Sequence, residues 1–244
     1  MPRLSIRRHV FLPPAIAERL DQRLEGAAAW DTLRSNETDL SFGVPATREA
    51  WKSQCGQAFL IERGAAIVEM ADRLGAKAIV SFGVGRACVE YQIHQVNPRM
   101  TLHLSDYAPE TVRRMRKLFS EAGSVSVVDI LRDDLPHVQG GLTLLHRIDT
   151  EFTDEQLRQV FARLSAADHG LILFVPDLFL TLRGLVVEAG RRVVSSTRLR
   201  RATAAGHVRT RAVYDTFWRG LYEVRSEGRL DSDGHYILLA APGT

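Results

Sequence analysis

Cysteine is scarce in this chain, whose 244 residues include only Cys55 and Cys88. Two cysteines give neither a disulfide framework nor the ligand spacing of a metal cluster, so we expect a reducing compartment, the cytoplasm, and no bound metal. We also expect no signal peptide, because the basic first 14 residues contain no apolar segment of secretory length. These absences argue against a disulfide-stapled secreted domain.

Long hydrophobic runs are absent as well. The most apolar region, residues 171–187, is interrupted by Pro176, Asp177 and Arg183, and a bilayer would penalise the two charges heavily. We therefore predict a core strand followed by a helix there, and no membrane association. With 45% hydrophobic and 25% charged residues, the chain can bury a sizeable core as a globular domain.

Acidic residues are missing from residues 191–211, although the whole chain carries a net charge of only +3. This segment holds seven arginines: Arg191, Arg192, Arg198, Arg200, Arg201, Arg209 and Arg211. Such a segment suits a nucleic-acid surface, a solvated loop or the pocket wall for an anionic small molecule. An exposed basic segment is favoured over nucleic-acid binding.

Two glycines separated by one residue follow a short apolar run at residues 78–82. The run and the apolar-periodic segment after it predict a buried strand, a tight turn and a helix start. Gly83 and Gly85 have no Cβ, so backbone can approach a ligand there, and the helix N-terminus behind them offers N–H groups and a partial positive charge. This geometry is suited to holding a nucleotide.

Strand and helix periods alternate from residue 77 onward. Strands are predicted at residues 78–82, 100–105, 125–129, 142–146 and 170–175, and helices near 87–96, 109–122, 153–166 and after 177. This order predicts an α/β fold with a doubly wound, parallel sheet and helices on both faces. Two further strand candidates, residues 221–226 and 236–240, predict a closing hairpin.

The first 75 residues show no convincing strand alternation. We predict a helical N-terminal cap over residues 1–75 and a nucleotide-binding domain over residues 76–244. Within the cap, a helix is expected from Pro13 through Leu24, an irregular lid over residues 26–53, and an amphipathic helix over 58–74.

Acidic residues stand at the ends of two neighbouring predicted strands. Asp106 follows the second strand, where a carboxylate can accept hydrogen bonds from both ribose hydroxyls of a nucleoside held over the glycine turn. Asp129 follows the third strand, where it can meet the exocyclic amino group of an adenine. Helix capping is the simpler explanation for either acid taken alone.

Three motifs together resemble class I S-adenosylmethionine (SAM)-dependent methyltransferases. Ser81-Phe82-Gly83-Val84-Gly85-Arg86-Ala87 resembles the acid-x-Gly-x-Gly-x-Gly turn of that family, with Ser81 at the acid and Ala87 at the third glycine. Leu104-Ser105-Asp106-Tyr107-Ala108-Pro109-Glu110 resembles its second motif, and Val128-Asp129-Ile130-Leu131-Arg132-Asp133-Asp134-Leu135-Pro136 its third. The resemblance covers roughly two-thirds of the chain, counting the hairpin.

The resemblance implies a Rossmann-like, mostly parallel seven-stranded sheet with a C-terminal antiparallel hairpin, and SAM as cofactor. It implies cofactor contacts from Ser81, Phe82, Gly83, Gly85, Asp106, Tyr107, Asp129, Ile130 and His146. A nicotinamide enzyme is the nearest competitor, but its fingerprint needs a third glycine where Cys88 stands. Leu145-His146-Arg147-Ile148-Asp149 replaces the tetrapeptide of the methylases that act on planar amines of DNA, RNA bases and glutamine.

Methyl transfer needs alignment of donor and acceptor, exclusion of water and a place for one proton. His146 is the first candidate for the general base or for a donor contact, and a structurally satisfied histidine at a strand end is the alternative. An acceptor wall is expected from a set of aromatic and cationic residues: Phe42, Trp51, Arg211, Tyr214 and Trp218. The alternative is that these aromatic residues fill a core between cap and sheet.

The sequence thus predicts a methyltransferase that acts on an oxygen or nitrogen of a small-molecule metabolite. An RNA-modifying or RNA-binding protein is a second hypothesis, based on the arginines of residues 191–211. A methyltransferase-like scaffold without catalysis is a third, based on Ser81 and Ala87. The sequence leaves the oligomeric state open, including a homodimer.

Overall fold

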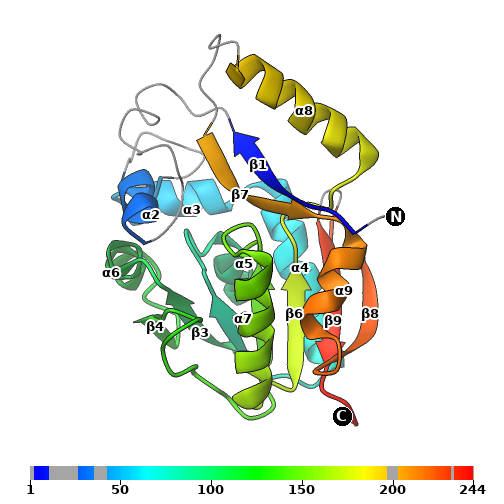
Figure 1. Cartoon of the computed structure of the whole chain (residues 1–244). Coiled ribbons are helices and arrows are strands. Elements are labelled where there is room, and N and C mark those ends of the chain that lie inside the picture. Colours follow the sequence, from blue (N-terminus) through cyan, green and yellow to red (C-terminus); the bar gives the residue numbers. More distant parts are fainter. Residues whose placement is uncertain (1–2, 11–26, 36–42, 197–202, 232–233, 244) are drawn as a thin grey trace.

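The computed structural model describes residues 3–10, 27–35, 43–196, 203–231 and 234–243 (Figure 1). The predicted helix from Pro13 lies outside these residues. The helices are α2 (Ala27–Arg34), α3 (Arg48–Cys55), α4 (Ala58–Arg73), α5 (Cys88–Val96), α6 (Pro109–Leu118), α7 (Asp154–Ala166), α8 (Leu182–Ser196) and α9 (Arg211–Trp218). None of these is long and apolar enough to cross a bilayer.

A seven-stranded sheet forms the centre of the molecule. Its order is β4-β3-β2-β5-β6-β9-β8. The strands are β2 (Ala78–Phe82), β3 (Thr101–Asp106), β4 (Ser124–Val127), β5 (Leu142–His146), β6 (Leu171–Val175), β8 (Glu223–Arg229) and β9 (His235–Ala240). The first five run parallel, and β9 pairs antiparallel with both β6 and β8. The predicted doubly wound sheet and its closing hairpin are confirmed.

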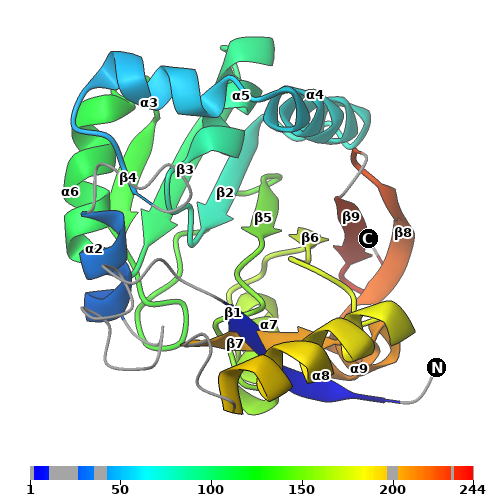
Figure 2. The same ribbon diagram turned by 90° about the horizontal axis from the view of Figure 1, so that it is seen from above.

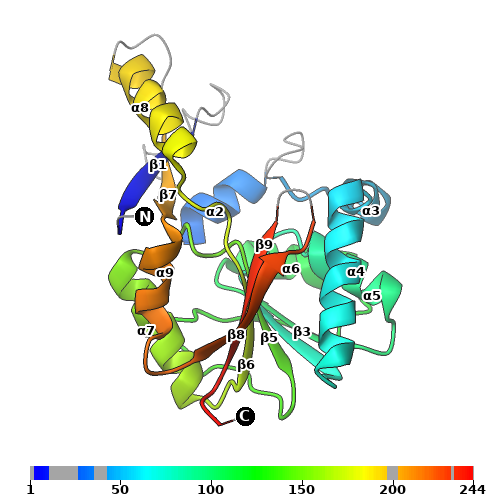
Figure 3. The ribbon, with the colours of Figure 1, turned by 90° about the vertical axis from the view of Figure 1, so that its right-hand side faces the viewer.

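Helices cover both faces of this sheet (Figures 2 and 3). On one face lie α3, α4 and α5, and on the other lie α7 and α9. Each face has its own buried cluster, one around Ile79 and Leu104 and the other around Phe161 and Phe174. The predicted amphipathic helix, α4, is therefore part of a sheet layer, because its apolar side packs on the strands.

The two cysteines form a disulfide between the last residue of α3 and the first residue of α5. This corrects the expectation that two cysteines build no disulfide. The chain returns on itself between α3 and α5, which brings the two Cα atoms to 4.7 Å across a sequence separation of 33. The indole Nε1 of Trp51 also donates to the carbonyl of Arg86 at 2.7 Å, so α3 is held against the glycine turn twice.

A second, two-stranded sheet lies above the carboxyl ends of the parallel strands (Figure 1). It consists of β1 (Ser5–Val10) and β7 (Thr203–Arg209), paired antiparallel. The prediction that residues 1–75 lack strands is therefore wrong. β1 could not be recognised from its sequence, because it has no apolar alternation and pairs with a strand about 200 residues away. Helix α8 follows β6 but packs beside β1, away from the main sheet, as Figures 1 and 3 show.

Glycine is required where β7 meets the loop after β5. Gly206 has φ +73°, and a Cβ there would lie 2.0 Å from the carbonyl oxygen of Thr150. The neighbouring His207 N–H donates to that same oxygen at 2.8 Å. This contact fixes the small sheet over the β5–α7 loop.

Candidate functional site

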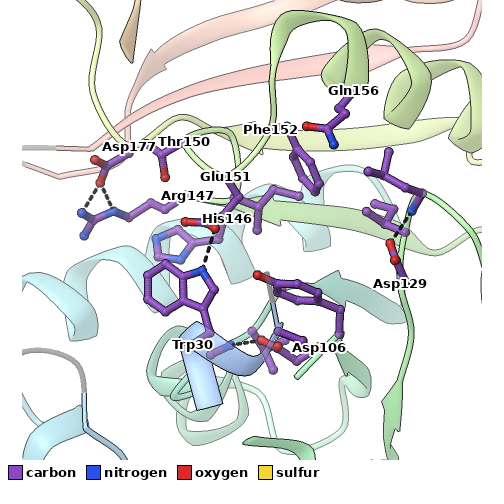
Figure 4. A pocket seen from close by; sticks show the side chains of 18 of the residues that line it. Trp30, Asp106, Asp129, His146, Arg147, Thr150, Glu151, Phe152, Gln156 and Asp177 are labelled. Atoms are coloured by element: carbon purple, nitrogen blue, oxygen red, sulfur yellow. Dashed lines mark hydrogen bonds and ion pairs between the residues drawn. The ribbon is translucent and has the colours of Figure 1, made fainter. Parts of the chain in front are cut away.

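A cavity of about 840 Å³ opens at the carboxyl ends of β2, β3 and β5 (Figure 4). The sheet order reverses there, with β3 on one side of β2 and β5 on the other, and doubly wound sheets bind ligands at that point. Residues of β1, α2 and β7 complete the wall from above. Asp106 and Asp129 lie on the other side of the cavity from Arg147 and Asp177 (Figure 4).

The glycine turn lines the floor of this cavity as the sequence predicts. Gly83 and Gly85 have φ +65° and +55°, a left-handed conformation that side chains rarely adopt. A Cβ on Gly83 would lie 2.5 Å from Cγ2 of Ile148, so the turn also needs glycine for space. The Gly85 N–H donates to Oδ2 of Asp106 at 2.9 Å, which ties the turn to the end of β3.

Asp106 points toward the glycine turn and is 1% exposed. Its Oδ1 accepts the N–H of Ala108 at 3.0 Å, and its Oδ2 also accepts from the Arg34 guanidinium at 3.1 Å. Arg34 comes from α2, lies over Gly85 and stacks on Trp30 at 4.9 Å. A carboxylate offers about four lone-pair positions, so Asp106 keeps acceptor capacity beside these three donors.

Asp129 also lines the cavity, in the loop after β4 rather than in the strand, which ends at Val127. Its Oδ1 accepts the N–H of Leu131 at 3.0 Å, and Arg132 lies 3.6 Å from Oδ2. Tyr107 and Ile130 line the same end. Burial together with the nearby carboxylates raises the pKa of Tyr107 above its usual value, so its hydroxyl stays protonated.

Ser81 and Phe82 do not line the cavity, because both are buried within β2. The Ser81 hydroxyl donates to Oε1 of Glu90 at 2.7 Å. Glu90 lies on α5 and is 2% exposed, so a carboxyl group is present beside the strand residue where the resembled family has its acid. Desolvation by burial raises the pKa of Glu90 to about 7.

His146 lines the cavity, and one of its ring nitrogens is already engaged. Its Nε2 lies 2.8 Å from Nη1 of Arg63, whose Nε donates to Asp231 at 2.6 Å. A guanidinium only donates, so Nε2 accepts and the imidazole is neutral with its proton on Nδ1. Burial and the charges of Arg63 and Arg147 lower the pKa of His146 well below 6.5. This arrangement agrees with the alternative prediction for His146, a histidine whose hydrogen bonds are satisfied within the structure at the end of a strand.

The described residues that were expected to form the acceptor wall do not line the cavity. Phe42, the remaining one, lies outside the described residues. Trp51 is fully buried among α3, α5 and α6, in contact with Tyr91 and Phe119. Tyr214 and Trp218 belong to the core between α7, α9 and the sheet. These three aromatic residues therefore fill the core, which was the alternative to an acceptor wall.

Arg211 is likewise absent from the cavity wall. It pairs with Asp215 on its own helix and with Glu227 on β8 at 2.7 Å. The other described arginines of residues 191–211 also have partners in the fold. Arg209 is fully buried and donates to Asp154 and to two carbonyls of the β5–α7 loop, while Arg191 and Arg192 bind β1 carbonyls and Glu188.

Sequence reasoning missed several residues of the wall. Trp30 and Glu151 face each other across the cavity, with the indole N–H 2.6 Å from Oε2 of Glu151 (Figure 4). Arg8, Arg147 and Asp177 form the wall beyond them. A signal was present for Arg147 and Glu151, which follow His146 in the loop after a predicted strand, and for Asp177, which follows the predicted strand at residues 170–175.

The structure resembles solved methyltransferase structures over most of its length. Human N-acetylserotonin methyltransferase, solved in complex with SAM, superposes on 93% of this chain with a TM-score of 0.56 and 17% sequence identity. PigF, solved with SAH, covers 86% of it at TM-score 0.60 and 17% identity, and the mitomycin 7-O-methyltransferase MmcR covers 80% at 0.58 and 16%. The chain has the class I methyltransferase fold.

This class I fold is shown by structure rather than by sequence. No protein-family profile matches the sequence, and no curated protein sequence matches it. The chain spans 65%, 62% and 57% of the lengths of the three methyltransferases just described. The likeness therefore establishes the fold, and the chemistry has to be argued from the cavity itself.

Proposed function

We propose that this chain binds SAM in the cavity and transfers its methyl group to an oxygen or nitrogen of a small molecule. The observation that carries the proposal is the convergence of two carboxylates, Asp106 and Asp129, with the left-handed turn of Gly83 and Gly85 at one end of the cavity. Structures of the same fold are named for methyl transfer to small molecules, and some contain SAM or its demethylated product, S-adenosylhomocysteine (SAH).

The residues of the cavity fit an adenosine group. Asp106 retains capacity to accept one ribose hydroxyl, Asp129 lies where it can accept an adenine amino group, and Tyr107 and Ile130 supply flat and apolar surface. A volume of about 840 Å³ has room for the cofactor and a small acceptor. His146 would contribute its Nδ1–H to the donor end.

When bound, SAM supplies an electrophilic methyl group, and the protein has to align the acceptor and receive its proton. His146 and Glu151 are the titratable side chains of the wall considered for this role. His146 is poorly suited, because its Nε2 accepts from Arg63, its Nδ1 carries the proton and its pKa is well below 6.5. The carboxylate of Glu151 is the other, and we favour it because it can accept the acceptor's proton beside the Trp30 indole that orients it.

Transfer of a labelled methyl group from SAM to a panel of hydroxylated and aminated arenes tests the function. We expect label in at least one acceptor, with Glu151→Gln slowing the transfer by about a hundredfold or more and His146→Gln by less. A faster rate for Glu151→Gln than for His146→Gln would assign the base to His146. SAH binding without transfer to any member would support a scaffold that has lost catalysis.

Binding measurements distinguish SAM from NAD as the cofactor and a small molecule from RNA as the partner. SAH should bind and NAD should not, because Cys88 and its disulfide stand where a nicotinamide fingerprint needs glycine. RNA binding with a steep salt dependence would support the second hypothesis. The described arginines of residues 191–211 are held by acids or carbonyls, which favours the small-molecule acceptor.

A further inference from the structure

Two arginines share one buried carboxylate at the acceptor end of the cavity. Asp177, two residues after the end of β6, has a side chain only 4% exposed, and it pairs with Arg8 through Oδ2 and with Arg147 through Oδ1. Arg147 and Asp177 line the cavity (Figure 4), and Arg8 is a further residue of its lining. We call Arg8, Asp177 and Arg147 the arginine clamp.

The clamp carries a net positive charge. The clamp itself has two guanidinium groups and one carboxylate. The neighbouring Asp149 carboxyl accepts the Asp177 N–H, and burial raises its pKa to about 6. Arg209 donates to the backbone carbonyl of Asp149 and pairs with Asp154 at 2.7 Å. Each guanidinium has five N–H donors, of which Asp177 takes only some. With side chains 26% and 47% exposed, Arg8 and Arg147 present further donors to the cavity.

The protein holds this clamp in place by several independent contacts. The N–H of Asp177 donates to Oδ1 of Asp149 at 2.9 Å, so the shared carboxylate is fixed from behind. Arg147 has φ +57°, a left-handed conformation that few residues other than glycine adopt, and its N–H donates to the carbonyl of Val175 at 2.8 Å. Backbone strain of this kind is concentrated at functional sites.

The position of the clamp relates it to the acceptor rather than to the cofactor. Asp106 and Asp129 lie at the other side of the cavity, with Trp30, His146 and Glu151 between them and the clamp (Figure 4). A molecule that reaches Glu151 with a hydroxyl can therefore extend to Arg147. Guanidinium groups bind carboxylates through paired, charge-assisted hydrogen bonds.

We propose that the methyl acceptor is a carboxylate-bearing hydroxyarene or similar acid, whose carboxylate binds Arg8 and Arg147 while Asp177 sets their spacing. This inference rests on the proposed methyl transfer and names the chemical class of its acceptor. A purely structural role, in which the ion pairs only fasten β1 to the body, is the alternative. It would give no preference between an acid and its neutral amide.

Calorimetry with matched pairs tests the proposal: hydroxybenzoates against the corresponding hydroxybenzamides, and hydroxynaphthoates against their amides. Titrations are run with and without saturating SAH. We expect wild-type protein to bind at least one acid about tenfold or more tightly than its amide. Arg147→Gln and Arg8→Gln should each reduce that ratio to about threefold or less, and Arg147→Lys should retain part of it.

The matched control is Arg73→Gln, which removes the same charge from an exposed arginine of α4 paired with Glu69. It should keep the acid preference. The proposal is overturned if no acid in the panel binds more tightly than its amide, or if the preference survives both clamp variants. Arg8 lies on β1, so Arg8→Gln can also weaken the attachment of this strand. If Arg8→Gln unfolds at a lower temperature than the wild type, Arg147→Gln alone decides the test.

These titrations also distinguish the two proposals. Absence of SAH binding to the wild-type protein would contradict the methyltransferase function, and the acid preference of the cofactor-free protein would still decide whether the clamp binds anions. SAH binding without an acid preference would leave the function standing and reject the acceptor class.

Discussion

The two ends of the cavity differ in how their residues are brought together. At the cofactor end, Gly83, Gly85 and Asp106 belong to consecutive strands joined by one helix, and their contacts span about 20 residues. At the acceptor end, Arg8 of β1 meets Asp177 across a separation of 169 residues. Local motifs can therefore predict the first end, whereas the second exists only through long-range pairing.

The largest expected effect concerns the junction that holds the acceptor end together. Gly206→Ala would place a Cβ 2.0 Å from the Thr150 carbonyl at a positive φ, so we expect a loss of roughly 3–5 kcal/mol in the free energy of unfolding. Gly220→Ala is the control, since Gly220 has φ +81° with no atom nearby. Chemical denaturation should show a loss of only about 1 kcal/mol for that variant. Equal losses would mean that β7 does not approach the β5–α7 loop closely.

The disulfide gives the next largest effect, and it belongs to the cofactor end. Cys88→Ser should lower the free energy of unfolding by about 3–4 kcal/mol under oxidising conditions, because the bond closes a loop of 33 residues. Cys55→Ser should lower it equally, and the double variant no further. A reductant should destabilise the wild-type protein alone. If reductant does not change the unfolding free energy of the wild-type protein, the disulfide is contradicted and the two cysteines are unpaired.

Glu90 gives a smaller effect that depends on pH. The pKa of Glu90 is raised from 4.5 to about 7 in the folded protein. The contribution of Glu90 to the free energy of unfolding is therefore fully present below pH 4.5 and is lost as the pH rises through 7. Glu90→Gln should therefore raise the free energy of unfolding by about 1–3 kcal/mol at pH 8 and change little near pH 4. The same substitution at the exposed Glu62 of α4 is the matched control for the chemical change. A flat difference for Glu90→Gln across this range would contradict the buried, proton-binding state of Glu90.

The sequence predicted the main sheet well because its information is local. Alternating periods marked β2, β3, β5 and β6 to within a residue or so, and two further strand candidates, residues 221–226 and 236–240, predicted the closing hairpin that the resemblance also implied. Asp106 and Gly85 followed from that order, since parallel strands end at the same edge. Local pattern alone was enough to place a candidate nucleotide site.

Other features depend on contacts that no local pattern records. β1 holds Arg7, Arg8 and His9 in succession and only two apolar residues, Ile6 and Val10, so no local pattern marks it and its strand pairs with β7. His146 was found, but its partner Arg63 lies 83 residues earlier on α4 and was not. Trp51, Tyr214 and Trp218 have the composition of an aromatic wall and pack in the core instead, because burial depends on the arrangement of the layers.

Titration calorimetry of SAH with wild-type protein and Asp106→Asn tests most directly whether the carboxylate and the glycine turn hold an adenosine. Wild-type protein should bind one SAH per chain, and Asp106→Asn should bind it about tenfold or more weakly, because the charge-assisted hydrogen bond to the ribose is lost. The exposed Asp72→Asn should bind like the wild type. Absence of binding by the wild type, or equal affinity of a folded Asp106→Asn protein, would contradict the adenosine site.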